Sequence, residues 1–178
     1  MSEDVDRLWG KKWFEYFEDL LPDKTNKHHL ELQQACFELS NACFDITEKH
    51  IKLTPGALEV LNSIKSAGHD QIIISNTGAE SLPLFLNAVS ITQFFPTGKA
   101  FAVDSHVNPT RNKRDVLKEF LKNKTYDEII IIGDSPSDMA LKQVAGGKTF
   151  LYSHANKTHR VCTADYKIND LKELLKEI

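Results

Sequence analysis

The chain has 178 residues, of which 41% are apolar and 26% are charged, a composition typical of one globular domain with at most a small appendage. Its net charge of −3 gives no electrostatic basis for binding nucleic acid or an anionic membrane. The three cysteines lack a CxxC spacing, which argues against a disulfide framework or a zinc site. We therefore expect a protein of the reducing cytoplasm, without a signal peptide or a membrane-spanning segment.

The first fifty residues contain two runs in which apolar side chains recur at helical spacing. The first run extends from Val5 to Leu20 and the second from Leu32 to Ile46. Leu21-Pro22-Asp23 lies between the runs, and proline interrupts a helix. This pattern predicts an α-helical hairpin, with a cap-like character, over residues 1–52.

From Thr54 onward, helical and strand patterns alternate. Thr54-Pro55 predicts the start of a helix, and Gly68 predicts its end. Strands are expected at 71–75, 93–95, 99–104, 129–132, 148–152 and near 166–168. The intervening helices include one over about 137–145 and a closing one on Leu171, Leu174 and Leu175. The alternation predicts an α/β fold with a doubly wound parallel sheet over residues 53–178.

The most informative strand is the run of four isoleucines at 129–132, which leads into Gly133 and Asp134. An all-apolar strand without polar alternation is typical of a parallel sheet covered on both faces. Asp134 is then expected at the carboxyl end of the sheet, where α/β proteins bind ligands. Asp138 follows at the start of the next helix, and two carboxylates suit Mg²⁺. As structural alternatives, Asp134 can cap that helix and Asp138 can favour its first turn.

Two further polar groups are expected at the same edge of the sheet. Ser75, Asn76 and Thr77 follow the strand at 71–75, and Gly78 supplies a turn whose N–H groups can bind phosphate oxygens. Lys113 begins the helix before the strand at 129–132 and brings an ammonium group. The alternative roles are turn formation for Ser75 and Asn76 and a solvated surface position for Lys113.

These segments, in this order, resemble the haloacid dehalogenase (HAD) superfamily, most of whose members are Mg²⁺-dependent phosphatases. The resemblance covers about residues 54–178 and implies a Rossmann-like core with a helical cap. Its second, third and fourth motifs correspond to Ile72-Ile73-Ile74-Ser75-Asn76, to Lys113 in Asn112-Lys113-Arg114-Asp115, and to Gly133-Asp134-Ser135-Pro136-Ser137-Asp138.

The resemblance implies a role for each of these side chains. Ser75 would bind the transferring phosphoryl group with help from Asn76 and Thr77, and Lys113 would neutralise its charge. Asp134 would bind Mg²⁺, directly or through water, and Asp138 would support this metal site. The implied function is that of a Mg²⁺-dependent phosphohydrolase acting on a small phosphorylated metabolite.

The family's first motif, an Asp-x-Asp on the central strand of the sheet, has no evident counterpart. Its first Asp is the nucleophile in the family. Asp4-Val5-Asp6 has the right letters, but no apolar strand precedes it. Without the motif, we expect the chain alone to have little or no phosphatase activity.

Four explanations for the missing motif remain open. The first is that the chain is a fragment, and the second is that another chain, or a homodimer with exchanged strands, completes the sheet. The third is that the protein is a catalytically inactive phosphate-binding or protein-interaction module. The fourth is that Phe44-Asp45-Ile46-Thr47 is a degenerate first motif. The last explanation is disfavoured by the helical spacing of the residues around it.

Overall fold

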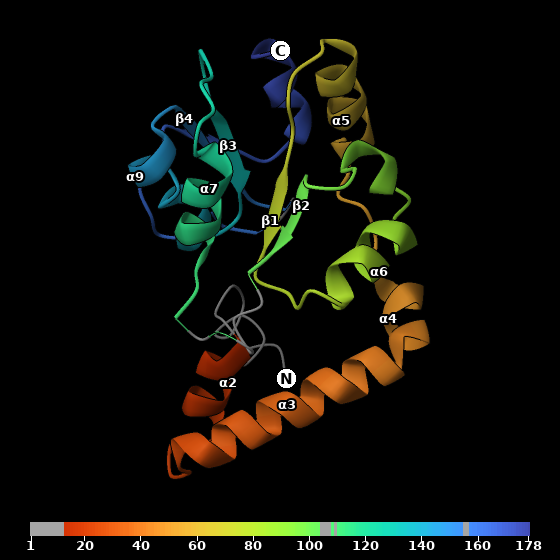
Figure 1. The fold of residues 1–178 in the computed structure, drawn as a ribbon, viewed down its shortest axis with the longest axis vertical. Coiled ribbons are helices and arrows are strands. Elements are labelled where there is room, and N and C mark those ends of the chain that lie inside the picture. Colours follow the sequence, from red (N-terminus) through yellow and green to blue (C-terminus); the bar gives the residue numbers. More distant parts are fainter. Residues whose placement is uncertain (1–12, 104–107, 109, 155–156) are drawn as a thin grey trace.

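Three helices precede the first strand in the computed structural model, which describes residues 13–103, 108, 110–154 and 157–178 (Figure 1). They are α2 (Trp13–Leu20), α3 (Asn26–Ala42) and α4 (Phe44–His50). A turn at Pro22 separates α2 from α3, and the two helices pack against each other. The predicted hairpin is therefore present in the described residues, whereas Val5, like Asp4 and Asp6, lies outside them. A domain boundary near residue 52 stays a prediction.

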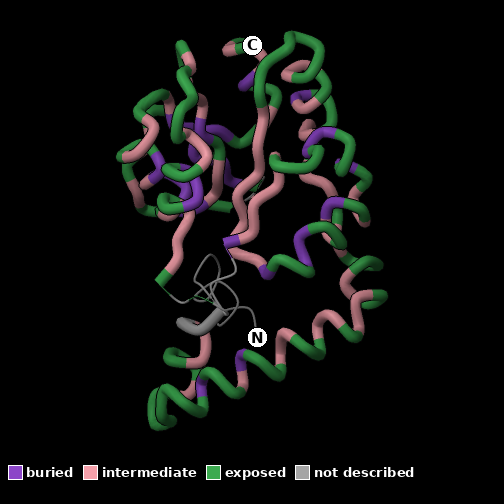
Figure 2. The backbone as a smooth tube through the Cα atoms, in the orientation of Figure 1, coloured by how far each residue is buried: buried purple, intermediate pink, exposed green. Residues whose placement is uncertain are grey.

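The apolar stripe predicted from Leu32 to Ile46 is not buried as a whole. Leu39 is 65% exposed and Ile46 is 55% exposed, while the buried residues of α3 are His29 and Gln33. The reason is that α3 lies to one side of the sheets, so that most of its surface contacts solvent (Figure 2). The predicted single helix over this run is also divided, because α3 ends at Ala42 and Cys43 separates it from α4.

All strand pairs are parallel, as predicted, but they form two sheets. The first sheet pairs β1 (Ile73–Ser75) with β2 (Ala100–Ala102). The second has the order β3-β4-β5, with bounds Ile130–Gly133, Lys148–Tyr152 and Tyr166–Ile168. No hydrogen bonds join β1 to β3. Every predicted strand but one is therefore confirmed in place, while the single sheet is divided between β1 and β3.

Helices cover the two sheets from opposite faces, with α5 (Ala57–Ser66) on one face and α7 (Lys113–Leu121) on the other. On the α5 side, Ile64 and Ile130 pack against the same buried cluster. On the α7 side, Leu117 packs with Ile131 and Ile74. Successive residues of a strand point to opposite faces, so the isoleucines of β3 reach both layers. The two helices thereby connect sheets that share no hydrogen bond.

The remaining helices are short, and the structure differs from the sequence-based expectation at several helical elements. They are α6 (Ser81–Ala88), η1 (Thr92–Phe94), α8 (Pro136–Met139), α9 (Lys142–Ala145) and η2 (Leu171–Lys176). The strand predicted at 93–95 is wrong: a 3₁₀ turn there directs Phe94 and Phe95 into the apolar cluster around Leu82. The helix predicted over 137–145 is interrupted between α8 and α9. The helix expected to start at Thr54-Pro55 starts two residues later, at Ala57.

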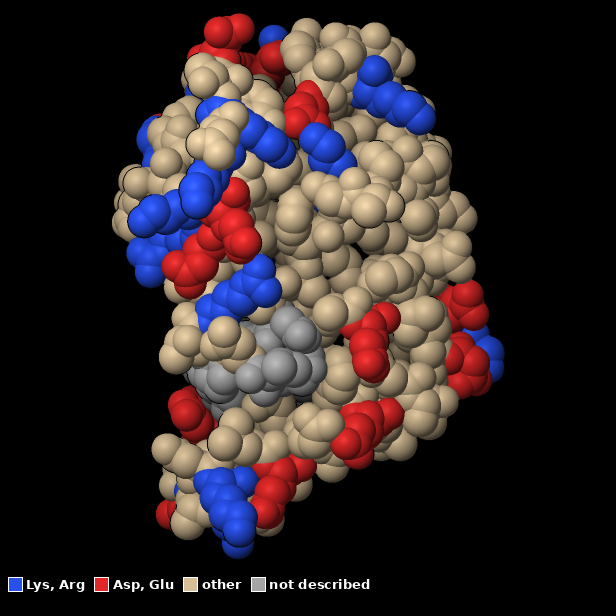
Figure 3. All heavy atoms as spheres, viewed as in Figure 1, with Lys and Arg blue, Asp and Glu red and all other residues tan. Residues whose placement is uncertain are grey.

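Charged side chains of both signs are distributed over the face drawn in Figure 3. Basic groups gather at its upper left, and acidic groups are spaced along its lower edge, over α3. Among the described helices, none combines the length and the apolar character that crossing a membrane requires.

Candidate functional site

The carboxyl end of β3 turns directly into α8 through a closely packed loop. Ser135 is the N-cap of α8 and forms a capping box with Asp138. Its hydroxyl donates to Asp138 Oδ2 at 2.6 Å, and its backbone N–H donates to the same oxygen at 3.1 Å. The side chain of Asp138 lies so close to β3 that a Cβ at Gly133 would be 2.2 Å from the Asp138 Cβ. Glycine is therefore required at position 133 by a close approach.

Lys113 is the first residue of α7 and reaches across to this loop. Its ammonium donates to Asp138 Oδ1 at 2.6 Å, and the two side chains are only 12% and 9% exposed. The helix start is defined by a second capping box, in which Asn112 accepts from the N–H of Asp115 and Asp115 accepts from the N–H of Asn112. As predicted from its position at a helix start, Lys113 lies near the carboxyl end of β3.

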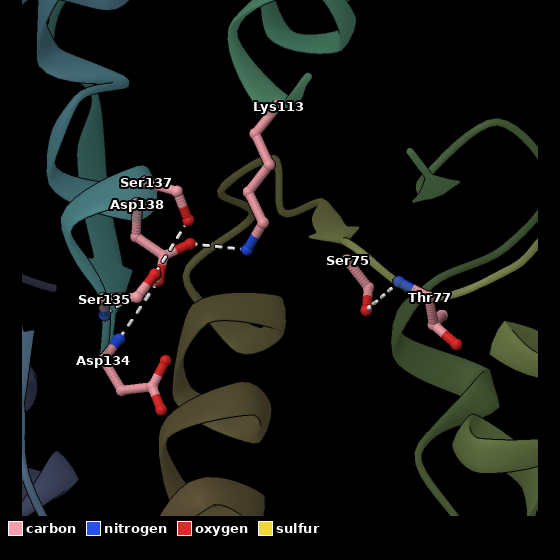
Figure 4. A network of polar contacts seen from close by, with 7 residues as sticks. All are labelled: Ser75, Thr77, Lys113, Asp134, Ser135, Ser137 and Asp138. Carbon is pink, nitrogen blue, oxygen red and sulfur yellow. Dashed lines mark hydrogen bonds and ion pairs between the residues drawn. The ribbon is translucent and has the colours of Figure 1, made fainter. Parts of the chain in front are cut away.

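Ser75 ends β1 on the other side of Lys113, and Asn76 and Thr77 follow it. The N–H of Thr77 donates to the Ser75 hydroxyl oxygen at 3.3 Å, so these residues form a local turn. Figure 4 shows Ser75 and Asp134 on opposite sides of the view, with the Lys113 ammonium between them. The described residues show no hydrogen bond between the Ser75 turn and the Asp134 loop. The structure thus joins Lys113 to Asp138 and leaves Ser75 across from them.

The fit to Mg²⁺ differs between the two aspartates. The Asp134 carboxylate accepts no hydrogen bond from any described residue, whereas both oxygens of Asp138 accept donors. One Asp138 oxygen also accepts from the Asp134 N–H at 3.2 Å. No group of three or more His, Cys, Asp or Glu residues gathers within the described ranges. Mg²⁺ is often held by one or two carboxylates with waters and phosphate oxygens, so Asp134 fits as a ligand and Asp138 as its support.

Ser135 is the residue of this site that the sequence analysis missed. Its signal was present, because Ser-x-x-Asp before a helix is the pattern of a capping box. The same pattern, in the form Asn-x-x-Asp, begins α7 at Asn112. Both boxes position a side chain of the Lys113–Asp138 pair, so local capping assembles the site from two separate helices.

A cleft of about 390 Å³ separates β1 from β3. We call it the inter-sheet cleft. Its lining includes apolar side chains from α5, α7 and the two strands with their flanking residues: Leu61, Ile64, Ile72, Ile74, Leu117, Phe120, Ile130 and Ile132. Asp138 lies at one end of the cleft, and Asp70 and Tyr126 lie at the other. The Tyr126 hydroxyl donates to Asp70 at 2.7 Å.

The segments considered for a first motif do not supply a described strand in this cleft. Phe44-Asp45-Ile46-Thr47 forms the first turn of α4, so the interpretation as a degenerate strand motif is wrong. Asp4-Val5-Asp6 lies outside the described residues. Five strands are described, and none of them lies between β1 and β3.

A family model described as haloacid dehalogenase-like hydrolase matches residues 1–152. The chain belongs to this family. A search of curated proteins finds no match. Many solved structures do match, and three of them illustrate the range of HAD-like proteins that share this fold.

A predicted phosphoglycolate phosphatase from Haemophilus somnus has a TM-score of 0.75 and 16% identity, over 99% of this chain and 82% of the neighbour. A putative β-phosphoglucomutase from Thermotoga maritima has a TM-score of 0.68 and 15% identity, over 100% and 84%. A HAD family hydrolase from Deinococcus radiodurans, solved with bound phosphate and sodium, has a TM-score of 0.64 and 16% identity, over 96% and 78%. At these identities the likeness shows the fold alone.

Proposed function

We propose that this HAD-family chain binds a phosphoryl group and Mg²⁺ at the carboxyl ends of β1 and β3, as the phosphate-binding part of a phosphohydrolase for a small phosphorylated metabolite. The observation that carries the proposal is the buried Lys113–Asp138 pair at the carboxyl end of β3. It places an ammonium group between the Ser75 turn and Asp134 (Figure 4).

The chemistry of phosphoryl transfer supports this assignment. Catalysis there depends on positioning and charge neutralisation of the phosphoryl oxygens. Ser75 and Thr77 offer hydroxyl groups, Asn76 offers an amide, and Lys113 offers a positive charge. Asp134 would hold Mg²⁺, which supplies further neutralising charge when bound. Asp138 would position both Lys113 and the Asp134 backbone through its hydrogen bonds.

The proposal holds that no carboxylate of the described residues acts as the nucleophile. No described strand brings an acid into the space between Ser75 and Asp134, and this supports the expectation of little turnover. The same observation favours the second candidate, a HAD-like module that binds phosphate without hydrolysing it. The two candidates share the binding site and differ in whether a completed protein turns over a phosphate ester.

The test is calorimetric titration of the purified chain with inorganic phosphate, with and without MgCl₂. We expect Mg²⁺ to strengthen phosphate binding. Ser75→Ala should weaken phosphate binding about tenfold, the effect of about 1.4 kcal/mol that a hydrogen bond to a charged group contributes, and Asp134→Asn should remove the strengthening by Mg²⁺. Hydrolysis of p-nitrophenyl phosphate by the same sample should stay at the background rate.

Matched controls are Ser66→Ala and Asp127→Asn, which change exposed side chains away from the site and should leave phosphate affinity unchanged. Absence of phosphate binding with and without Mg²⁺ would contradict the proposed site. Robust Mg²⁺-dependent hydrolysis by the purified chain would contradict the expectation of little turnover.

A further inference from the structure

Three helices follow the polar segments of the candidate site, and they differ in what secures their starts. α7 and α8 each begin with a capping box formed by residues that are close together in the sequence. α6 follows the Ser75 turn, and its N-cap residue, Glu80, makes no side-chain capping hydrogen bond. A helix start without a side-chain cap keeps backbone N–H groups unpaired and is less firmly held. The position of α6 therefore depends on contacts with other parts of the chain.

The helical hairpin provides such a contact at the first residue of α6. The Ser81 hydroxyl donates to Asn41 Oδ1, in the last turn of α3, at 2.8 Å. Ser81 is only 4% exposed, so loss of the Asn41 acceptor would leave a buried hydroxyl unpaired, which is destabilising. The hydrogen bond thus holds the start of α6 against the carboxyl end of α3.

Apolar contacts next to this hydrogen bond also join the hairpin to α6. The ring centroids of Phe44, the first residue of α4, and Phe85 of α6 are 5.7 Å apart. Leu53, which lies beyond α4 in the sequence, packs on the buried cluster that includes Leu82 and Leu86 of α6. Figure 1 shows α4 and the adjoining end of α3 below α6. Polar and apolar contacts together therefore fix α6 relative to the hairpin.

Backbone hydrogen bonds lead from the start of α6 back to the Ser75 turn. The N–H of Leu82 donates to the Gly78 carbonyl at 3.1 Å and closes the first turn of α6. Gly78 directly follows Thr77, whose N–H donates to the Ser75 hydroxyl oxygen. Coupling between two places in a protein requires a contiguous set of contacts of this kind. A shift of the start of α6 would thus be passed to the Ser75 hydroxyl through a short hydrogen-bonded segment.

We propose that Asn41 is a positioning residue for the phosphate-binding turn. By holding Ser81, it keeps α6 in place, and α6 keeps the Ser75 hydroxyl in the orientation that contacts a phosphoryl oxygen. The inference rests on the proposed phosphate site and adds to it a dependence on the helical hairpin. Because coupling between sites is reciprocal, phosphate bound at the Ser75 turn would also stabilise the contact between α3 and α6.

The test measures phosphate affinity and the order of the turn separately, in the full chain. Calorimetric titration with inorganic phosphate in the presence of MgCl₂ gives the affinity. Amide hydrogen exchange at Thr77, followed by NMR without phosphate, reports on the hydrogen bond to Ser75. The variants are Asn41→Ala, Ser81→Ala, the double variant, and Asn41→Asp, which retains the acceptor oxygen. The matched control is Gln34→Ala, because this exposed side chain of α3 bonds to a glutamate of the same helix.

We expect Asn41→Ala to weaken phosphate binding about fivefold, the low end of the coupling between two sites, and to speed amide exchange at Thr77. In the Ser81→Ala background the same substitution should have little further effect, because the hydrogen bond is already absent. Asn41→Asp should restore most of the affinity, and Gln34→Ala should leave both measurements unchanged. Circular dichroism verifies that each variant is folded.

Two outcomes would overturn the proposal. Unchanged amide exchange at Thr77 and unchanged phosphate affinity in folded Asn41→Ala would show that Asn41 has no effect on the turn. Additive effects of Asn41→Ala and Ser81→Ala would show that the two side chains act independently. If the parent chain binds no phosphate while Asn41→Ala still speeds exchange at Thr77, the proposed phosphate site is wrong, and the positioning of the turn by Asn41 is supported.

Discussion

Gly133 ends β3 at a point where any side chain would collide with Asp138. A Cβ there would also lie 2.5 Å from Asp138 Oδ2, and Asp138 is held in place by Ser135 and Lys113. We expect Gly133→Ala to lower the free energy of unfolding by about 3 kcal/mol, a cost typical of forcing extra atoms into a packed site. Urea denaturation measures this difference.

The matched control is Gly68→Ala, at the end of α5. Gly68 has a φ of +77°, and no atom lies within 4 Å of a Cβ built there. Gly68→Ala should lower the free energy of unfolding by about 1 kcal/mol, because only the left-handed backbone conformation disfavours alanine there. If Gly133→Ala and Gly68→Ala lower the free energy of unfolding equally, the close approach of Asp138 to β3 is not the reason that position 133 requires glycine.

The β4 and β5 elements are joined to α9 by the carboxylate of Asp165. Asp165 accepts from the N–H and the hydroxyl of Thr149, both at 2.8 Å, and from Lys142 at 2.6 Å. These hydrogen bonds, first that of Lys142 and then those of Thr149, lower the pKa of Asp165 from 3.8 to about 2. A lowered folded-state pKa stabilises the fold above the unfolded value, and this stabilisation is lost as the pH falls from about 4 to about 2.

We therefore expect Asp165→Asn to be less stable than the parent chain at neutral pH, with a difference that shrinks as the pH falls through this window. The urea midpoint, measured at intervals between pH 6 and pH 2, follows the difference. Asp127→Asn, at an exposed carboxylate with no hydrogen bond among the described residues, is the control for general charge effects. If the difference in urea midpoint between the parent chain and Asp165→Asn stays constant from pH 6 to pH 2, the Asp165 carboxylate does not have this stabilising role.

The two sheets of the described chain are held together by helices and, at the amino-terminal end of the cleft, by a polar contact. Asp70 precedes β1 and Tyr126 precedes β3, and the hydrogen bond between them spans the two halves. Lys99 also binds Asp70, and its hydrogen bond lowers the pKa of the Asp70 carboxyl group. Burial, followed by the bond to Asp70, raises the pKa of Tyr126 to about 12.

We expect Tyr126→Phe to lower the free energy of unfolding by about 1 kcal/mol at pH 7, the usual net contribution of a hydrogen bond. Because the folded-state pKa of Tyr126 is raised, its stabilising contribution is complete below about pH 10, the unfolded value, and is lost as the pH rises toward 12. Urea unfolding at pH 7 and above pH 10 measures this change.

Tyr166→Phe is the control for loss of a phenol, because the Tyr166 ring stacks on Phe150 and its hydroxyl has no hydrogen-bond partner in the described part of the chain. An equal loss of stability in both variants would mean that the Tyr126–Asp70 contact does not join the halves.

Local patterns were sufficient to locate most of the elements. The isoleucine runs around Ile73 and Ile131 became strands, and the turn residues after them became loops, because β-branched preference and turn chemistry act over a few residues. The same reasoning failed at 93–95, where Phe94 and Phe95 have the apolar character of a strand. Apolar runs of that length do not distinguish a strand from a buried turn.

The amino-acid sequence by itself determined the order in which strands and helices follow one another along the chain. It also placed Ser75, Lys113 and Asp134 next to the ends of these elements. Only the tertiary structure decided that Lys113 pairs with Asp138, that Asp134 keeps an unbonded carboxylate, and that β1 and β3 face each other across a cleft. The physical reason is that propensity and periodicity are properties of neighbouring residues. The pairing of a charge or a strand edge depends on which distant segments meet when the helices pack.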